Sequence, residues 1–376
     1  MTIPTHGAID CDVHPSVPDT AVLLPYLDDY WRDQVVNRHI HKQGFQLQSY
    51  PPNSPLSCRP DWRPKTGFPG SDLDLLRAHA LDAFGSQLAI CNVLHGAIAL
   101  FNEDMAAALI SAVNDYIATE WLDREPRLRA SILLPLQSPE LAVKEIERLA
   151  GDRRFVQVLV PVLGEMPLGR RAYWPIYEAA ARHGLTVGMH AGSTYRTSPT
   201  AAGWPSYQVE DYVVQSGGFE NQLLSFIAEG VFQKFPKLKL VCIESGFTWL
   251  PTLLWRVNKT WRGVRAEVPW LDRPPADIIR EHVRFTLQPL DLPASDPQKL
   301  LRVIEHVGGQ GLGSDDLLLF STDYPHWHFD GDKVLPDGLP DAMIRKILVD
   351  NPLAAYPRLS ESGAEPSSSR AEEKVP

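Results

Sequence analysis

The strongest constraint on the fold is an alternation of short apolar runs with amphipathic helical patterns. Eight such runs occur along the chain: GAIDCDV, SQLAICNVL, LRASILLP, FVQVLVP, LTVGMH, LKLVCIE, VRFTLQP and LLLFSTDYP. Strands that alternate with helices form a parallel sheet, and eight strand–helix units predict a (β/α)8 TIM barrel. The seventh run leaves an alternative open, because RFTLQP also suits a strand on the surface.

Helix signals lie between the runs. SPELAVKEIERLAG has Ser138 as its N-cap candidate and Glu140 in its first turn, and WPIYEAAARHG ends at Gly184. These patterns predict helices over residues 138–151 and 174–184.

Two segments are too long for ordinary connections between a strand and a helix. Residues 15–72, which are rich in proline, predict an insertion after strand 1 that covers one end of the barrel. Residues 192–218 predict a long loop after strand 5 that serves as a lid or an oligomer contact. We therefore predict one barrel domain over residues 1–359 and a disordered tail, rich in Ser, Glu and Pro, over residues 360–376.

Charge and composition exclude several classes of partner. The 376 residues carry a net charge of -10, and the sequence has no basic patch that would favour nucleic acid or an anionic membrane. No apolar stretch approaches the roughly 18 residues of a membrane span, and no signal segment is visible, so we expect a cytoplasmic protein. The four cysteines have no paired spacing, which indicates buried thiols rather than disulfides.

Residues that commonly bind metals stand at the ends of four predicted strands. Asp12 and His14 end the first run, His190 ends the fifth, Glu244 ends the sixth and Asp323 ends the eighth. Barrel enzymes carry their active sites at this rim, and an unpaired buried carboxylate is costly unless a cation binds it. We therefore expect Asp12, His14, His190 and Asp323 to bind a divalent metal, with zinc favoured and iron or manganese as alternatives.

Each of these residues also has an ordinary structural explanation. A single histidine such as His190 is more often hydrogen-bonded within a core, and Asp323 before a proline also suits a turn. Glu244 is open to two roles, a general base toward a metal-bound water or a ligand to a second metal. In the second case His326 or His328 would join it, whereas two histidines in a surface loop remain the alternative.

The order of these motifs resembles the amidohydrolase-related family, which includes aminocarboxymuconate semialdehyde decarboxylase. The similarity covers Asp-x-His after strand 1, MHAG after strand 5, ESGFTWLP after strand 6, STDYPH after strand 8 and VDNPLAAYP near the end, over residues 9–357. It implies that Asp12, His14, His190 and Asp323 bind a divalent metal at the barrel mouth.

One position departs from the family pattern. The decarboxylases of this family carry an acid/base histidine after strand 6, and alignment on Pro251 puts Ser245 at that position, with Glu244 before it. Other relatives resemble dinuclear iron or manganese proteins, such as the two-subunit aminoisobutyrate hydroxylase. With Glu244 and His326 as further ligands, the cluster would suit that oxygen chemistry or two-metal hydrolysis.

Residues outside the strand ends are candidates for substrate binding. His95 follows the second run, and Tyr195, Arg196 and Trp204 lie in the segment after strand 5, where Arg196 could bind a carboxylate. A packed lid would use the same aromatic residues.

These observations rank several functions. We expect first a metal-dependent hydrolase that acts on a small organic acid, amide or ester. A dinuclear oxygen-dependent hydroxylase comes second, and a non-oxidative decarboxylase comes third because of Ser245. A structural subunit that pairs with a homologous catalytic chain is the alternative outside the enzymes. The resemblance also implies a homodimer, or a hetero-oligomer in the subunit case.

Overall fold

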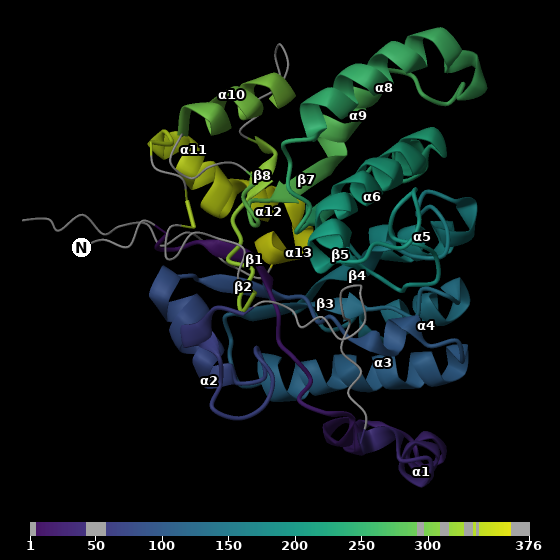
Figure 1. The fold of residues 1–376 in the computed structure, drawn as a ribbon, viewed down its shortest axis with the longest axis vertical. Coiled ribbons are helices and arrows are strands. Elements are labelled where there is room, and N and C mark those ends of the chain that lie inside the picture. Colours follow the sequence, from purple (N-terminus) through teal and green to yellow (C-terminus); the bar gives the residue numbers. More distant parts are fainter. Residues whose placement is uncertain are drawn as a thin grey trace, which may run out of the picture.

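The computed structural model describes residues 5–42, 58–291, 297–308, 316–326, 334–335 and 338–361. Within these residues, eight parallel strands form one sheet in which neighbours in sequence are neighbours in space, from β1 to β8 (Figure 1). Each strand coincides with one of the eight apolar runs, including the seventh, although β4 and β5 extend two and three residues beyond their runs. The strands are β1 (Ile9–Val13), β2 (Leu88–Cys91), β3 (Leu128–Leu133), β4 (Phe155–Leu163), β5 (Thr186–Ser193), β6 (Leu240–Ile243), β7 (Val283–Thr286) and β8 (Leu318–Leu319).

Hydrogen bonds between the first and last strands close the sheet into a barrel. The amide of Cys11 donates to the carbonyl of Phe320 at 2.9 Å, and the amide of His14 donates to the carbonyl of Tyr324 at 2.7 Å. These bonds lie beyond the two residues of β8, so the eighth run continues to pair with β1 after its regular strand ends. The predicted (β/α)8 barrel is confirmed.

The strands are buried on both faces, since one face fills the barrel and the other packs under helices. All five residues of β1 are buried, and so are the first eight residues of β4. This double burial explains why the runs are continuously apolar instead of alternating.

Helices surround the sheet (Figure 1). The α-helices are α1 (Asp29–Asn37), α2 (Leu73–Leu76), α3 (Glu103–Ile117), α4 (Pro139–Leu149), α5 (Trp174–Arg182), α6 (Gln208–Ala228), α7 (Val231–Lys234), α8 (Leu250–Val264), α9 (Pro275–His282), α10 (Pro297–Gly308), α11 (Asp341–Arg345), α12 (Asn351–Ala355) and α13 (Pro357–Glu361). Helix α4 begins after Ser138 as predicted, although the Ser138 side chain makes no capping hydrogen bond. Among the described helices, none is long and apolar enough to cross a membrane.

The predicted loop after β5 is shorter than expected. Residues 208–218 belong to α6, so only residues 194–207 connect the strand to the helix. Within that helix Gly218 lets α6 pack closely on β4, because a Cβ atom there would lie 2.9 Å from Leu163 Cδ2. The glycine therefore reflects helix packing rather than a turn.

The segment after β1 leaves the barrel and returns to it. The 3-10 helix η1 (Thr20–Tyr26) packs on α3, and α1 follows at the edge of the molecule (Figure 1). The chain then comes back at Cys58, which forms an antiparallel bridge with His326, and the ring of Trp62 lies 5.0 Å from that of Tyr324. Residues 43–57 and 362–376, which include most of the predicted tail, lie outside the described residues.

Candidate metal centre

Six side chains from four strands meet at the carboxyl end of the barrel. Asp12 lies in β1 with His14 just after it, His190 lies in β5, Glu244 follows β6, and Asp323 and His326 follow β8. All six are buried, with Glu244 the most exposed at 8%. The structure thus brings together every residue that the sequence analysis proposed as a ligand within the described part of the chain, whereas His328 lies outside it.

His14 and His190 lie around the carboxylate of Asp12. His14 Nε2 is 3.1 Å from Asp12 Oδ1 and 3.0 Å from Asp323 Oδ1. His190 Nε2 is 3.7 Å from Asp12 Oδ1 and 3.8 Å from Glu244 Oε2. These contacts place four potential donor atoms, from Asp12, His14, His190 and Glu244, within 4.8 Å of one another.

A second group of donor atoms shares two members with the first. His326 Nδ1 lies 3.0 Å from Glu244 Oε1 and 2.9 Å from Asp323 Oδ1. The ring of His326 also stacks on that of His14, with 4.3 Å between centroids. His14, Glu244, Asp323 and His326 form a second set of donors within 4.8 Å.

Hydrogen bonds to carbonyl groups determine which ring nitrogen each histidine turns toward the cluster. His14 Nδ1 lies 2.8 Å from the carbonyl oxygen of Asn92, and His190 Nδ1 lies 2.6 Å from that of Ala191. A carbonyl only accepts, so both Nδ1 atoms carry the proton. Nε2 is therefore the nitrogen that faces the cluster, and it binds a metal ion when it carries no proton.

The cluster leaves polar atoms unsatisfied in a way that suits a cation. Asp12 Oδ2 and His190 Nε2 are buried and have no hydrogen-bond partner within the part of the chain that the structure describes. Burying such groups without a partner costs about 1–3 kcal/mol each, and more for a charge. Imidazole and carboxylate donors match zinc, iron or manganese, so the residues fit a divalent metal.

Two of the acidic residues in the cluster have an unusual backbone conformation. Glu244 has φ 54° and Asp323 has φ 58°, both in the left-handed region that non-glycine residues rarely adopt. Such conformations cost about 1–3 kcal/mol each and cluster at functional sites. Glu244 directly follows β6 and Asp323 lies four residues after the end of β8, and at both positions the side chain joins the cluster.

The buried acids and imidazoles shift one another's pKa. Burial opposes the charge on Asp12, but His14 and His190 outweigh it and hold the pKa of Asp12 below its ordinary value. Burial likewise lowers the pKa of His326, but the Asp323 carboxylate reverses this and raises it to about 9. In the metal-free chain these side chains therefore form buried ion pairs.

Asn92 is a site residue that the sequence analysis missed. Its Nδ2 donates to Asp12 Oδ1 at 2.8 Å, and its Oδ1 accepts hydrogen bonds from Ser131 Oγ, at 2.5 Å, and from Gln157 Nε2, at 2.8 Å. Asn92 directly follows β2 and so lies at the same rim as the ligand candidates. Its position at a strand end was the available signal, but an amide suggests no metal chemistry by itself.

The residues predicted to bind substrate contact other groups of the protein. His95 is buried, and its Nδ1 accepts a hydrogen bond from the amide of Ala97 at 3.2 Å. The Tyr195 hydroxyl donates to Asp211 Oδ2 at 3.3 Å, and Trp204 is 51% exposed.

Arg196 is held by groups of the protein itself. Its Nη2 donates to the carbonyl oxygens of Ala99 and Leu100, at 3.2 and 2.9 Å, and its Nη1 lies 3.1 Å from Glu165 Oε1. The substrate roles of His95, Tyr195, Arg196 and Trp204 stay predictions.

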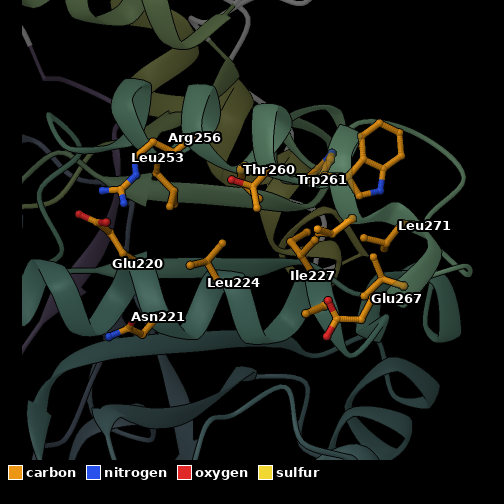
Figure 2. Close-up of a pocket in the computed structure, with 15 residues that line it drawn as sticks. Glu220, Asn221, Leu224, Ile227, Leu253, Arg256, Thr260, Trp261, Glu267 and Leu271 are labelled. Atoms are coloured by element: carbon orange, nitrogen blue, oxygen red, sulfur yellow. The ribbon is translucent and has the colours of Figure 1, made fainter.

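Two cavities differ in their relation to the cluster. One of about 330 Å³ is lined by Glu244 and Ser245, together with residues of α6 and of the segment after β7. A larger one of about 490 Å³ lies between α6 and α8 and is lined largely by apolar side chains, with Glu220 and Arg256 at one end (Figure 2). Since no cluster residue lines the larger cavity, the smaller one is the candidate substrate pocket.

Known proteins resemble the chain in sequence and in structure. The γ-resorcylate decarboxylase of Polaromonas sp. strain JS666 is 24% identical over 269 residues, which are 69% of this chain and 79% of that protein. The structure of a dihydroxybenzoic acid decarboxylase from Polaromonas sp. JS666, with bound manganese and the inhibitor 2-nitroresorcinol, has a TM-score of 0.63 at 20% identity and covers 93% of this chain and 96% of that one. An amidohydrolase from Mycobacterium avium subsp. paratuberculosis K-10 has a TM-score of 0.69 at 21% identity, with coverage of 96% and 99%.

These relatives correct two expectations. The prediction of a hydrolase is wrong, because the relatives in sequence are decarboxylases, which the sequence analysis ranked third on account of Ser245. Ser245 alone was therefore not enough to place decarboxylation third. The preference for zinc also lacks support, because the relative's structure contains manganese.

The similarity extends along almost the whole barrel. The profile of the amidohydrolase family matches residues 9–358, from the first residue of β1 into α13. This range contains all six residues of the cluster, and it confirms the resemblance inferred from the strand-end motifs. The chain therefore belongs to the amidohydrolase family of enzymes.

Proposed function

We propose that this protein is a metal-dependent, non-oxidative decarboxylase of an aromatic carboxylic acid. The observation that carries the proposal is the buried group of Asp12, His14, His190 and Asp323 beside a cavity of about 330 Å³, in a chain whose sequence relatives are γ-resorcylate decarboxylases. A cavity of this volume is large enough for a single substituted benzene ring.

The same four residues would hold the metal, and manganese is the favoured ion because the related decarboxylase structure contains it. When bound, a divalent cation supplies positive charge that orients the carboxylate of the substrate. The role of Asn92 is to keep Asp12 and His14 in place, through hydrogen bonds to both side chains.

The reaction needs a proton at the carbon that loses its carboxylate. The bond from the ring to the carboxylate breaks, carbon dioxide leaves, and the electron pair that stays on the ring carbon takes up a proton. We assign this proton to the pair formed by His326 and Glu244, whose Nδ1 and Oε1 atoms are 3.0 Å apart. His326 thereby supplies from the end of β8 the imidazole that Ser245 does not supply from the end of β6.

The experiment is a decarboxylation assay on manganese-loaded protein with 2,6-dihydroxybenzoate and related hydroxybenzoates. We expect release of carbon dioxide and, in heavy water, a product with one new deuterium on the ring. Fully loaded protein that releases no carbon dioxide from any of these acids would disprove the proposal. Protein with His190→Ala is the control, because it lacks one of the four proposed ligands.

A second candidate follows from the overlap of the two donor groups. Because His14, Glu244, Asp323 and His326 also lie within 4.8 Å, we propose as the alternative a dinuclear, oxygen-dependent hydroxylase. Two metal ions per chain together with oxygen consumption that depends on an organic substrate would favour this alternative. One manganese per chain and release of carbon dioxide without oxygen would exclude it.

A further inference from the structure

Both apolar side chains and hydroxyl groups line the cavity beside the cluster. Trp249 and Val213 provide apolar surface, and Thr248 and Ser216 provide hydroxyl groups. Glu244 belongs both to this cavity and to the cluster. A ring whose carboxylate is bound at the cluster would therefore extend its other substituents into the cavity.

The charged side chains among the described residues that line the cavity are all acidic. Among the lining residues that the structure describes, Glu244 and Asp291 carry carboxylates, and none is Lys, Arg or His. Arg196, the cation that the sequence analysis assigned to a substrate carboxylate, is bound instead to two carbonyl groups and to Glu165. A second negative charge on a substrate would meet Asp291 and Glu244, and the described cation beside them, His326, is already paired with Glu244 at 3.0 Å.

Asp291 lines the cavity at its solvent-exposed side. Its Oδ2 accepts a hydrogen bond from Thr248 Oγ1 at 3.2 Å. The same oxygen would lie only 1.9 Å from a Cβ atom at residue 246, so the glycine there permits the close approach. The carboxylate is thus held against the turn that follows Glu244.

We propose, on the basis of the decarboxylase function proposed above, that the substrate is a monocarboxylic aromatic acid whose other substituents are hydroxyl or amino groups. Such groups donate hydrogen bonds to Glu244 and Asp291, whereas a second carboxylate is repelled by both. Asp291 is accordingly a specificity-determining residue, and its charge disfavours dicarboxylic acids in the cavity.

The test compares 2,6-dihydroxybenzoate and 4-amino-2-hydroxybenzoate with 4-hydroxyisophthalate, which carries a second carboxylate. On manganese-loaded protein we expect kcat/KM for the better monoacid to exceed that for the diacid by about tenfold, because the second carboxylate of the diacid approaches Asp291. Equal values for the two classes would overturn the inference.

Charge variants test whether the acidic wall causes the preference. Val213 lines the cavity from α6 and is 64% exposed, so Val213→Arg adds a cation without removing a hydrogen bond. We expect this change to shift the ratio toward the diacid by about tenfold or more, and Asp291→Asn to shift it in the same direction. Val209→Arg is the matched control, since Val209 is 66% exposed on the same helix and does not line the cavity.

Equilibrium binding separates this inference from the proposed function. Calorimetry on the manganese-loaded protein measures the affinity for the same three acids without turnover. Tighter binding of the monoacids without any carbon dioxide release would uphold the acidic pocket and refute decarboxylation. Turnover with no preference, and no effect of Val213→Arg, would refute the pocket and uphold decarboxylation. Absence of both binding and turnover would refute both.

Discussion

Asn92 donates a hydrogen bond from its side chain to Asp12 Oδ1 at 2.8 Å, while its own carbonyl oxygen accepts one from His14 Nδ1 at 2.8 Å. One residue at the end of β2 therefore orients both of the proposed metal ligands that come from β1. Ser131 and Gln157 hold the amide of Asn92 in turn, from the neighbouring strands β3 and β4.

Replacement of Asn92 by Ala should weaken manganese binding by about 10- to 100-fold, the usual effect of removing a residue that orients metal ligands. The measurement is the dissociation constant for manganese. Asn114→Ala is the matched control, because Asn114 is also a buried asparagine but bonds to Leu133 and Glu145 instead. An unchanged constant in Asn92→Ala would contradict the positioning role.

His190→Ala and Asp323→Ala should each release the metal, because each removes one of four proposed donors. Metal content after dialysis is the readout, and we expect less than stoichiometric manganese in both variants. His183→Ala is the control, since His183 is 25% exposed and pairs with Glu147, which is not a cluster residue. Full manganese content in both site variants would refute the proposed centre.

His326→Gln should retain one manganese per chain and lose about 10²- to 10⁴-fold in kcat, the usual contribution of a general acid or base. Ser245→Ala should keep most of the activity, because the Ser245 hydroxyl donates to the neighbouring Gly246 carbonyl at 2.6 Å rather than to the cluster. Loss of manganese from His326→Gln would identify His326 as a ligand and favour the dinuclear alternative.

His95 should make the fold sensitive to acid. Burial lowers the pKa of His95 from 6.5 to about 4. Between these two pH values His95 is therefore protonated in the unfolded chain and neutral in the folded chain. Stability should therefore fall as the pH drops from 6.5 toward 4, by up to about 1.4 kcal/mol per pH unit from this group.

His95→Asn removes the titrating ring and keeps an acceptor for the amide of Ala97. We expect denaturant unfolding of this variant to depend less steeply on pH between 6.5 and 4 than that of the wild type. Identical slopes for His95→Asn and wild type would show that His95 does not control this transition.

Arg358 should be a major determinant of stability at the other end of the chain. It is fully buried, and its guanidinium donates to the carbonyls of Ala150, Asp152, Phe155 and His183. Arg358→Ala leaves these acceptors without their donor and should cost about 3–5 kcal/mol of unfolding free energy. Arg345→Ala, at a 62% exposed side chain, should change it by less than about 0.5 kcal/mol.

The sequence alone was enough to predict the barrel. Each strand is buried on both faces, so its residues form a continuous apolar run that can be recognised in the sequence. It also indicated the rim where the site lies, since Asp12, His14, His190, Glu244 and Asp323 end their runs and the carboxyl ends of parallel strands share one edge. These inferences depend on local pattern and on a general rule of barrel geometry.

Only the tertiary structure decided how the site is completed. Asn92 joins Asp12 through a bond that spans 80 residues, His326 meets Glu244 across 82, and Arg196 is held by carbonyls nearly 100 residues away. The helical placement of Gly218 depended likewise on the approach of α6 to Leu163. Such contacts have no local signature, because they arise where strand ends distant in sequence converge and where burial forces each polar atom to find a partner.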